Sequence, residues 1–168
     1  GSNENIKAGS NMTLDDAEFF SISNPDIKKA LTNSRALEKR SELNWLNWKE
    51  IPIPNLSKAG AGGIRPVGRF MMMDRSDSFI NRLEQEINAA KSGFDGPSVH
   101  IHIFSGLSGG TGAGSFLDVC YMIKNIAGRM GGVNTYGYFF LPDVNLSKIP
   151  DSDNLTRSYI RKNGYAAM

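Results

Sequence analysis

The clearest pattern of apolar and polar positions along the chain is a helical one. Phe79, Leu83, Ile87 and Ala90 recur three or four positions apart, with charged residues between them. This spacing places the four side chains on one face of a helix, and Gly93 stands where a helix commonly ends. The pattern predicts an amphipathic helix whose apolar face covers part of a core.

Strand-like and helix-like patterns alternate further along the chain. Residues 99–104 form a short run that is half β-branched, and residues 133–141 are rich in aromatic and β-branched side chains. Between them, residues 116–130 are apolar on nearly every side, as expected of a helix packed between a sheet and its neighbours. Strand, helix and strand in this order predict a βαβ unit with parallel strands and a right-handed crossover. The predicted fold class is therefore α/β.

The remaining segments are less regular. Residues 17–23 indicate a short strand, while residues 25–39 and 151–168 carry helix-spaced apolar positions. Pro66 suits the first position of a helix that continues through Met71-Met72-Met73, whose side chains we expect to fill the core.

Composition limits the class of protein. The chain has 168 residues, 40% hydrophobic and 21% charged, which is normal for one soluble domain. A net charge of +2 with scattered basic residues does not favour nucleic acid as a partner. No apolar run reaches the length of a membrane span, and the single Cys120 argues against a disulfide or a structural zinc site. We expect a cytoplasmic protein, with residues 1–12 as a disordered or tag-derived tail and residues 13–168 as one domain.

A glycine-rich segment between the first predicted strand and the next helix is the main candidate for chemistry. It reads Ser108, Gly109, Gly110, Thr111, Gly112, Ala113, Gly114. Ligands of open parallel sheets bind at the carboxyl ends of strands, where this segment begins. Its glycines allow positive φ and leave room for a ligand, so backbone N–H groups, two hydroxyls and the N-terminus of a helix starting near Ser115 can hold a phosphate.

Two common phosphate-binding motifs do not fit this segment. A Walker loop requires a lysine before its final Ser or Thr, and none precedes Ser115 although Gly109 and Gly114 have the correct spacing. The dinucleotide fingerprint Gly-x-Gly-x-x-Gly fits in no frame.

Residues 108–114 instead match the pattern Ser/Ala/Gly-Gly-Gly-Thr-Gly-Ser/Ala-Gly at every position, which resembles the signature of the tubulin/FtsZ superfamily. Residues 60–69, Gly-Ala-Gly-Gly-Ile-Arg-Pro-Val-Gly-Arg, also look like that family's loop at the outermost phosphate. Together with residues 161–166, this sequence looks most like that of uncharacterised bacterial tubulin-like proteins. The resemblance covers roughly residues 55–168.

The resemblance implies a Rossmann-like parallel sheet flanked by helices, a GTP or GDP ligand accompanied by Mg²⁺, and longitudinal self-association into filaments. It implies that residues 109–114 hold the inner phosphates and that Gly62 and Gly63 lie on the γ-phosphate side. Asn163 and Tyr165 would contact the guanine, and Asp143 the ribose. Arg65 would contact phosphate or pair with a carboxylate such as Asp74.

The chain also departs from this family. Nothing before Gly60 resembles the family's first phosphate loop, and the acidic loop that helps to activate water would follow residue 168. We therefore expect an internal piece of the GTPase domain, incomplete at both ends, with exposed sheet edges and no catalytic residue to name. Three functions remain open: a GTP-binding module, a non-enzymatic assembly module that retains the fold, and an unrelated α/β nucleotide-binding enzyme.

One further pair of residues suggests a metal site. His100 and His102 lie two apart on a predicted strand, and therefore on one face of it. No cluster of Cys, Asp or Glu is near them in sequence, so we expect a structural role and no metal.

Overall fold

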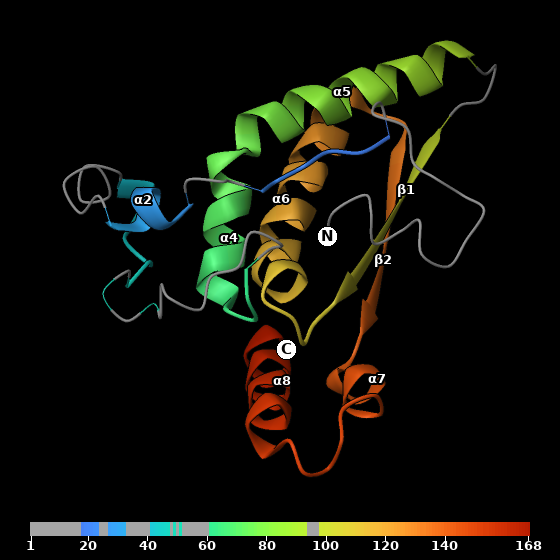
Figure 1. The fold of residues 1–168 in the computed structure, drawn as a ribbon. Helices are drawn as coiled ribbons and strands as arrows, with labels where there is room; N and C mark the ends of the chain where they lie inside the picture. Colours follow the sequence, from blue (N-terminus) through green and yellow to red (C-terminus); the bar gives the residue numbers. More distant parts are fainter. Residues whose placement is uncertain are drawn as a thin grey trace.

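The computed structural model describes residues 18–23, 27–32, 41–47, 49, 51, 61–93 and 98–168. Its elements are α2 (Ile27–Thr32), the 3-10 turn η1 (Ser41–Leu43), α4 (Arg65–Asp74), α5 (Ser76–Gly93), β1 (Val99–Gly106), α6 (Thr111–Met130), β2 (Val133–Phe140), α7 (Pro142–Leu146) and α8 (Asn154–Ala167) (Figure 1). Among the described helices, none combines the length and apolar character needed to cross a bilayer.

The two strands form a parallel pair, and the α/β prediction is confirmed. Val99 lies opposite Val133, and the register continues without a break to Gly106 opposite Phe140. Helix α6 is the crossover between the strands, and it lies between α4 and the sheet (Figure 1). Helices α7 and α8 lie beyond the carboxyl ends of the strands (Figure 1), so among the described elements α6 and then α4 lie beside the sheet, and α7 and α8 cap its end.

Helices α4 and α6 pack with their backbones in close contact. A Cβ atom on Gly68 would clash with the Gly110 carbonyl, and one on Gly114 would clash with the Arg65 carbonyl. The Arg69 guanidinium donates to both carboxylate oxygens of Asp118, at 2.8 and 3.1 Å. Small residues and one bidentate ion pair therefore set the spacing of these helices.

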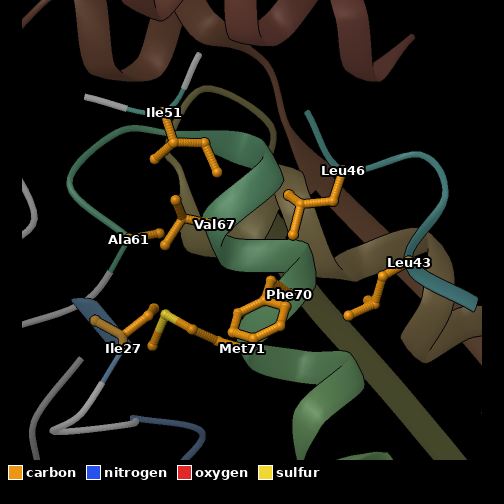
Figure 2. Packing of buried hydrophobic residues seen from close by; sticks show 8 residues of the cluster. All are labelled: Ile27, Leu43, Leu46, Ile51, Ala61, Val67, Phe70 and Met71. Carbon is orange, nitrogen blue, oxygen red and sulfur yellow. The ribbon is translucent and has the colours of Figure 1, made fainter. Parts of the chain in front are cut away.

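A cluster of buried hydrophobic residues surrounds α4 rather than the sheet. Figure 2 shows its eight side chains, contributed by α4 and the segments that precede it: Ile27, Leu43, Leu46, Ile51, Ala61, Val67, Phe70 and Met71. Val67 and Phe70 are almost completely buried, at 0% and 2% exposure. Met71 and Met72 are buried as predicted, whereas Met73 is half-buried.

The sheet is poorly covered within the described residues. Seven of the eight residues of β2 are exposed. On the face turned away from α6, aromatic rings of the two strands stack, with centroids 4.6 Å apart for Phe104 and Tyr138 and 5.0 Å apart for His102 and Tyr136. The two histidines are part of this exposed stack, and no group of three potential metal ligands occurs among the residues described.

Several predicted boundaries differ from the structure. Residues 18–23 contain no strand. Phe20 instead packs edge-on against Phe79, with the ring centroids 5.8 Å apart. Pro66 occupies the second position of α4, because the helix begins at Arg65. Helix α6 begins at Thr111 rather than near Ser115, and the short helix α7 was not predicted.

The amphipathic helix is confirmed as α5, and the closing helix is confirmed as α8. The predicted helix over residues 25–39 is seen as α2 in its described part. The rest of that prediction and the tail predicted for residues 1–12 lie outside the described residues.

Candidate functional site

A hollow of about 500 Å³ lies at the carboxyl ends of the strands, between two glycine-rich loops and the cap formed by α7 and α8. It is lined by Gly62, Gly63, Ile64, Ser108, Gly109, Asn145, Lys148, Ile149, Thr156, Tyr159, Ile160 and Asn163. Among these lining residues there is no carboxylate, and Lys148 is the one charged side chain. The hollow is therefore suited to an anionic ligand with an apolar part.

The loop after β1 is short and ends in the N-terminus of a long helix. Leu107 donates its backbone N–H to the carbonyl of Phe140 at 2.9 Å, which continues the strand pairing up to the loop. Gly110 is the N-cap of α6, so residues 111–114 form the first turn of the helix. A helix leaves its first four N–H groups without an intrahelical acceptor and carries a partial positive charge at that end. Anions bind readily at such a terminus.

The glycines of residues 109–114 do not use the positive φ that glycine allows. Positive φ occurs at Gly62 and Gly63, with φ of 58° and 77°, and at none of the four glycines between residues 109 and 114. A Cβ on Gly110 would approach the Gly63 carbonyl carbon to 2.8 Å, and one on Gly112 the Gly106 oxygen to 2.7 Å. Close packing of the chain on itself is what requires these glycines.

Two glycines instead face open space at the hollow. A Cβ on Gly109 or on Gly63 would meet no atom within 4 Å. Both residues line the hollow, so a ligand can approach their backbone directly. The glycines that bind the loops together and the glycines that leave room for a ligand are thus different residues.

Hydrogen bonds that involve four side chains join the two loops to each other and to α7 and α8. The backbone N–H of Ala61 donates to Thr111 Oγ1 at 3.3 Å. The side-chain amide of Asn163 donates from Nδ2 to the carbonyl of Gly63 at 2.9 Å and to that of Ser108 at 3.0 Å. Ser108 Oγ in turn accepts a hydrogen bond from Asn145 Nδ2. The loops, α6, α7 and α8 are therefore held as one unit.

Helix α8 is fixed in place by two further features. Gly164 is buried, and a Cβ there would clash with the Pro142 ring, so α8 crosses closely over the start of α7. Arg157 donates from Nη1 to the carbonyls of Leu146 and Ile149, at 3.1 and 2.8 Å. These contacts hold the segment between α7 and α8 that closes one side of the hollow.

The predicted site residues divide between the hollow and its surroundings. Gly62, Gly63, Ser108, Gly109 and Asn163 line it, while residues 110–114 lie behind them at the start of α6.

Three other predicted residues do not line this hollow. Asp143 borders a separate hollow together with Arg157 and Arg161. Tyr165 is 83% exposed and points to solvent. Arg65 donates from Nε to the carbonyl of Ala113 at 3.1 Å, and burial lowers the pKa of its guanidinium.

Sequence reasoning missed several lining residues, of which Tyr159 is the most informative. It lies four positions before Asn163, so both side chains project from the same face of α8. This spacing was visible in the sequence. Asn145 and Lys148 had no such signal, because they belong to a short helix and turn without periodicity.

Comparison with known proteins decides the family. A family model described as tubulin like matches residues 1–168, the whole chain. The chain belongs to the tubulin-like family. Its parallel strands and flanking helices agree with the Rossmann-type fold of tubulin-like proteins. Searches of curated proteins and of solved structures found no match.

Proposed function

We propose that this tubulin-like chain binds a guanine nucleotide, GTP or GDP, in the hollow between the two glycine loops. The observation that carries the proposal is that the hollow is bordered by open glycine backbone beside a helix N-terminus and by an aromatic–amide pair, Tyr159 and Asn163, on α8. Its volume of about 500 Å³ falls within the usual range for small-ligand pockets.

The phosphates lie against the glycine loops in this proposal. Gly63 and Gly109 leave the backbone accessible, and the first turn of α6 supplies unpaired N–H groups and a partial positive charge. Lys148 adds a full positive charge to the lining, and no carboxylate among the described lining residues opposes it. An anionic ligand is therefore favoured over a neutral or cationic one.

The base lies against α8. Tyr159 is 57% exposed and borders the hollow, so its ring is available for stacking on a purine. Asn163 has both amide hydrogens directed at loop carbonyls, which leaves Oδ1 as an acceptor for donors on the base edge. Guanine presents N–H donors at its N1 and N2 positions, whereas adenine has an acceptor at N1.

Magnesium would accompany the nucleotide rather than occupy a protein site. Mg²⁺ usually binds to one or two carboxylates and to substrate phosphates. Because the described lining residues include no carboxylate, the phosphates and water would supply the ligands in this proposal.

Self-association is the second part of the proposal. Hydrolysis of GTP needs a group that activates water, and the described residues that line the hollow include no carboxylate for that purpose. We propose that the protein acts in the cytoplasm through longitudinal, tubulin-like self-association, with hydrolysis at the contact between subunits. A non-enzymatic assembly module remains the alternative, and it is favoured by the exposure of seven of the eight residues of β2.

Calorimetric titration of GTP, GDP and ATP, with and without magnesium, tests the proposal. Gly109→Val adds a side chain at a residue that lines the hollow and where a Cβ meets no atom within 4 Å, and we expect it to abolish guanine-nucleotide binding while the protein stays folded. Gly128→Val is the matched control, since Gly128 also faces open space but lies far along α6. Equal binding by wild type and Gly109→Val, or equal affinity for ATP and GTP, would contradict a guanine-nucleotide site here.

A further inference from the structure

One side chain connects three segments that are distant in sequence. Asn163 on α8 donates from the same nitrogen to the carbonyl of Gly63, 100 positions away, and to that of Ser108, 55 positions away. These two carbonyls belong to the two glycine loops on either side of the hollow. The contact is therefore a tie across the end of the hollow where the loops meet α8.

The chemistry of the two partners determines the orientation of the amide. A backbone carbonyl can only accept a hydrogen bond, and a carboxamide nitrogen carries two hydrogens. Each hydrogen of Asn163 Nδ2 thus has its own acceptor, and the reverse orientation would place Oδ1 against two other oxygens. Both donors of the side chain are used in joining the loops.

The residue rests on a helix that is fixed in place, whereas the loop that it contacts is exposed on its outer side. The adjacent Gly164 packs tightly on Pro142, which fixes the position of α8. Gly62 and Gly63 are exposed and have positive φ, and a Cβ on Gly63 would meet nothing within 4 Å. On this outer side of the loop, the hydrogen bond from Asn163 holds the Gly63 carbonyl.

We propose that Asn163 is a positioning residue that sets the distance between the two glycine loops before any ligand arrives. The glycine loops proposed to hold the phosphates are then preorganised by a residue of α8 that contacts both of them. The ligand part of this inference rests on the proposed nucleotide function, but the tie itself is a property of the free protein. A role in contacting the base alone would leave the loops unaffected.

Hydrogen–deuterium exchange of the free protein tests the tie directly. Asn163→Leu has nearly the same size and removes both donors, so we expect faster exchange in peptides covering residues 61–64. There, the N–H groups of Ala61 and Ile64 are bonded to Thr111 Oγ1 and to the Ala61 carbonyl. Asn88→Leu makes the same chemical change on the exposed surface of α5 and should leave this exchange unchanged. Unchanged exchange in peptides from α5 will show that the variant remains folded.

A second experiment uses a phosphate ligand that has no base. Inorganic tripolyphosphate should bind in the hollow of the wild-type protein. Asn163→Leu should lower the affinity for tripolyphosphate by about tenfold, in line with the loss of two ordinary hydrogen bonds. The affinity of the same variant for GTP should fall by at least the same factor. Asn163→Asp, which keeps the size but replaces the donors by acceptors, should reproduce the faster exchange.

The two hypotheses fail in different ways. Wild-type exchange at residues 61–64 in both Asn163 variants would overturn the tie, as would a loss of GTP binding with tripolyphosphate binding intact. Absence of both GTP and tripolyphosphate binding in the wild-type protein would overturn the proposed function, while the exchange measurement would still decide on the tie.

Discussion

Gly110 lies so close to Ile64 that a Cβ on it would come within 2.5 Å of the Ile64 backbone nitrogen. The two residues belong to different glycine loops, and both loops border the hollow. The absence of a side chain at Gly110 is therefore what allows the loops to touch. Because the obstacle is backbone, it cannot move aside as a flexible side chain would.

Gly110→Ala should for this reason lower the free energy of unfolding, by about 2 kcal/mol or more, which is typical of overpacking a closely packed site. Gly109→Ala should change it by less than about 1 kcal/mol, because a Cβ there meets nothing within 4 Å. Urea denaturation of the two variants measures the difference. Equal stability of the two would mean that the loops are further apart than described.

The ion pair between Arg69 and Asp118 should contribute measurably to the packing of α4 on α6. It is bidentate, Asp118 is only 16% exposed, and the guanidinium lies 4.3 Å from the ring centroid of Trp45. A double-mutant cycle with Arg69→Met and Asp118→Leu should give a coupling energy of about 1 kcal/mol.

The exposed pair Arg82–Glu86 on α5 is the control for this cycle. Its coupling should be no more than about 0.5 kcal/mol, as is usual for surface pairs one helical turn apart. A value for Arg69 and Asp118 as small as the control's would show that the spacing of the helices depends on the glycines alone.

Asp153 should make the stability of the protein depend on pH through the start of α8. Its carboxylate accepts a hydrogen bond from the Thr156 backbone N–H at 3.0 Å, and this bond holds the pKa of Asp153 below its ordinary value. A lowered folded-state pKa contributes stability that is present above the unfolded pKa, near 4, and is lost as the pH falls through the folded value.

Asp153→Ala should therefore be less stable than wild type at pH 7, and this difference should shrink as the pH falls below about 4. Asp153→Asn keeps a capping side chain without the titrating charge, so its stability relative to the alanine variant should vary little with pH. Urea denaturation at pH 7 and pH 3 checks both expectations. A difference between wild type and Asp153→Ala that grows on acidification would contradict the capping role.

Replacing Tyr159 should weaken the binding of a guanine nucleotide without changing the binding of tripolyphosphate, which has no base. Its ring borders the hollow and makes its proposed contact with the base. Tyr159→Ser should lower the affinity for GTP by about tenfold or more, in keeping with about 1–3 kcal/mol per stacked base. Tyr159→Phe should retain most of the affinity. Fluorescence titration with a labelled guanine nucleotide makes the comparison. Equal losses in the Ser and Phe variants would assign the effect to the hydroxyl rather than to stacking.

The sequence was sufficient for the βαβ unit and for α5, because their apolar patterns extend over many residues. It did not reveal that α6 begins at Thr111, since Gly112 and Gly114 disfavour a helix locally. Tertiary packing outweighs this preference, because the same glycines let the first turn contact Gly106 and Arg65. Helix α7 was missed because its five residues are too few to show a period.

The glycine loops themselves were predictable as a motif, but the roles within them were not. Which glycines are packed and which are open depends on contacts such as that between Gly110 and Gly63, which no local pattern encodes. The hydrogen bond from Asn145 to Ser108 joins residues 37 positions apart and was likewise invisible. Asn163 was predicted from family resemblance, whereas its two carbonyl partners come from the fold alone.

The buried cluster lies around α4, whereas β2 is open to solvent along seven of its eight residues. In most α/β domains the sheet is the last part to come apart, because it is covered on both faces. Here we expect the reverse order of unfolding, with the pair of strands as the least stable part of the fold. Mild denaturant would then release β2 first and leave α4, α6 and the chain packed around α4 as the persistent folding unit.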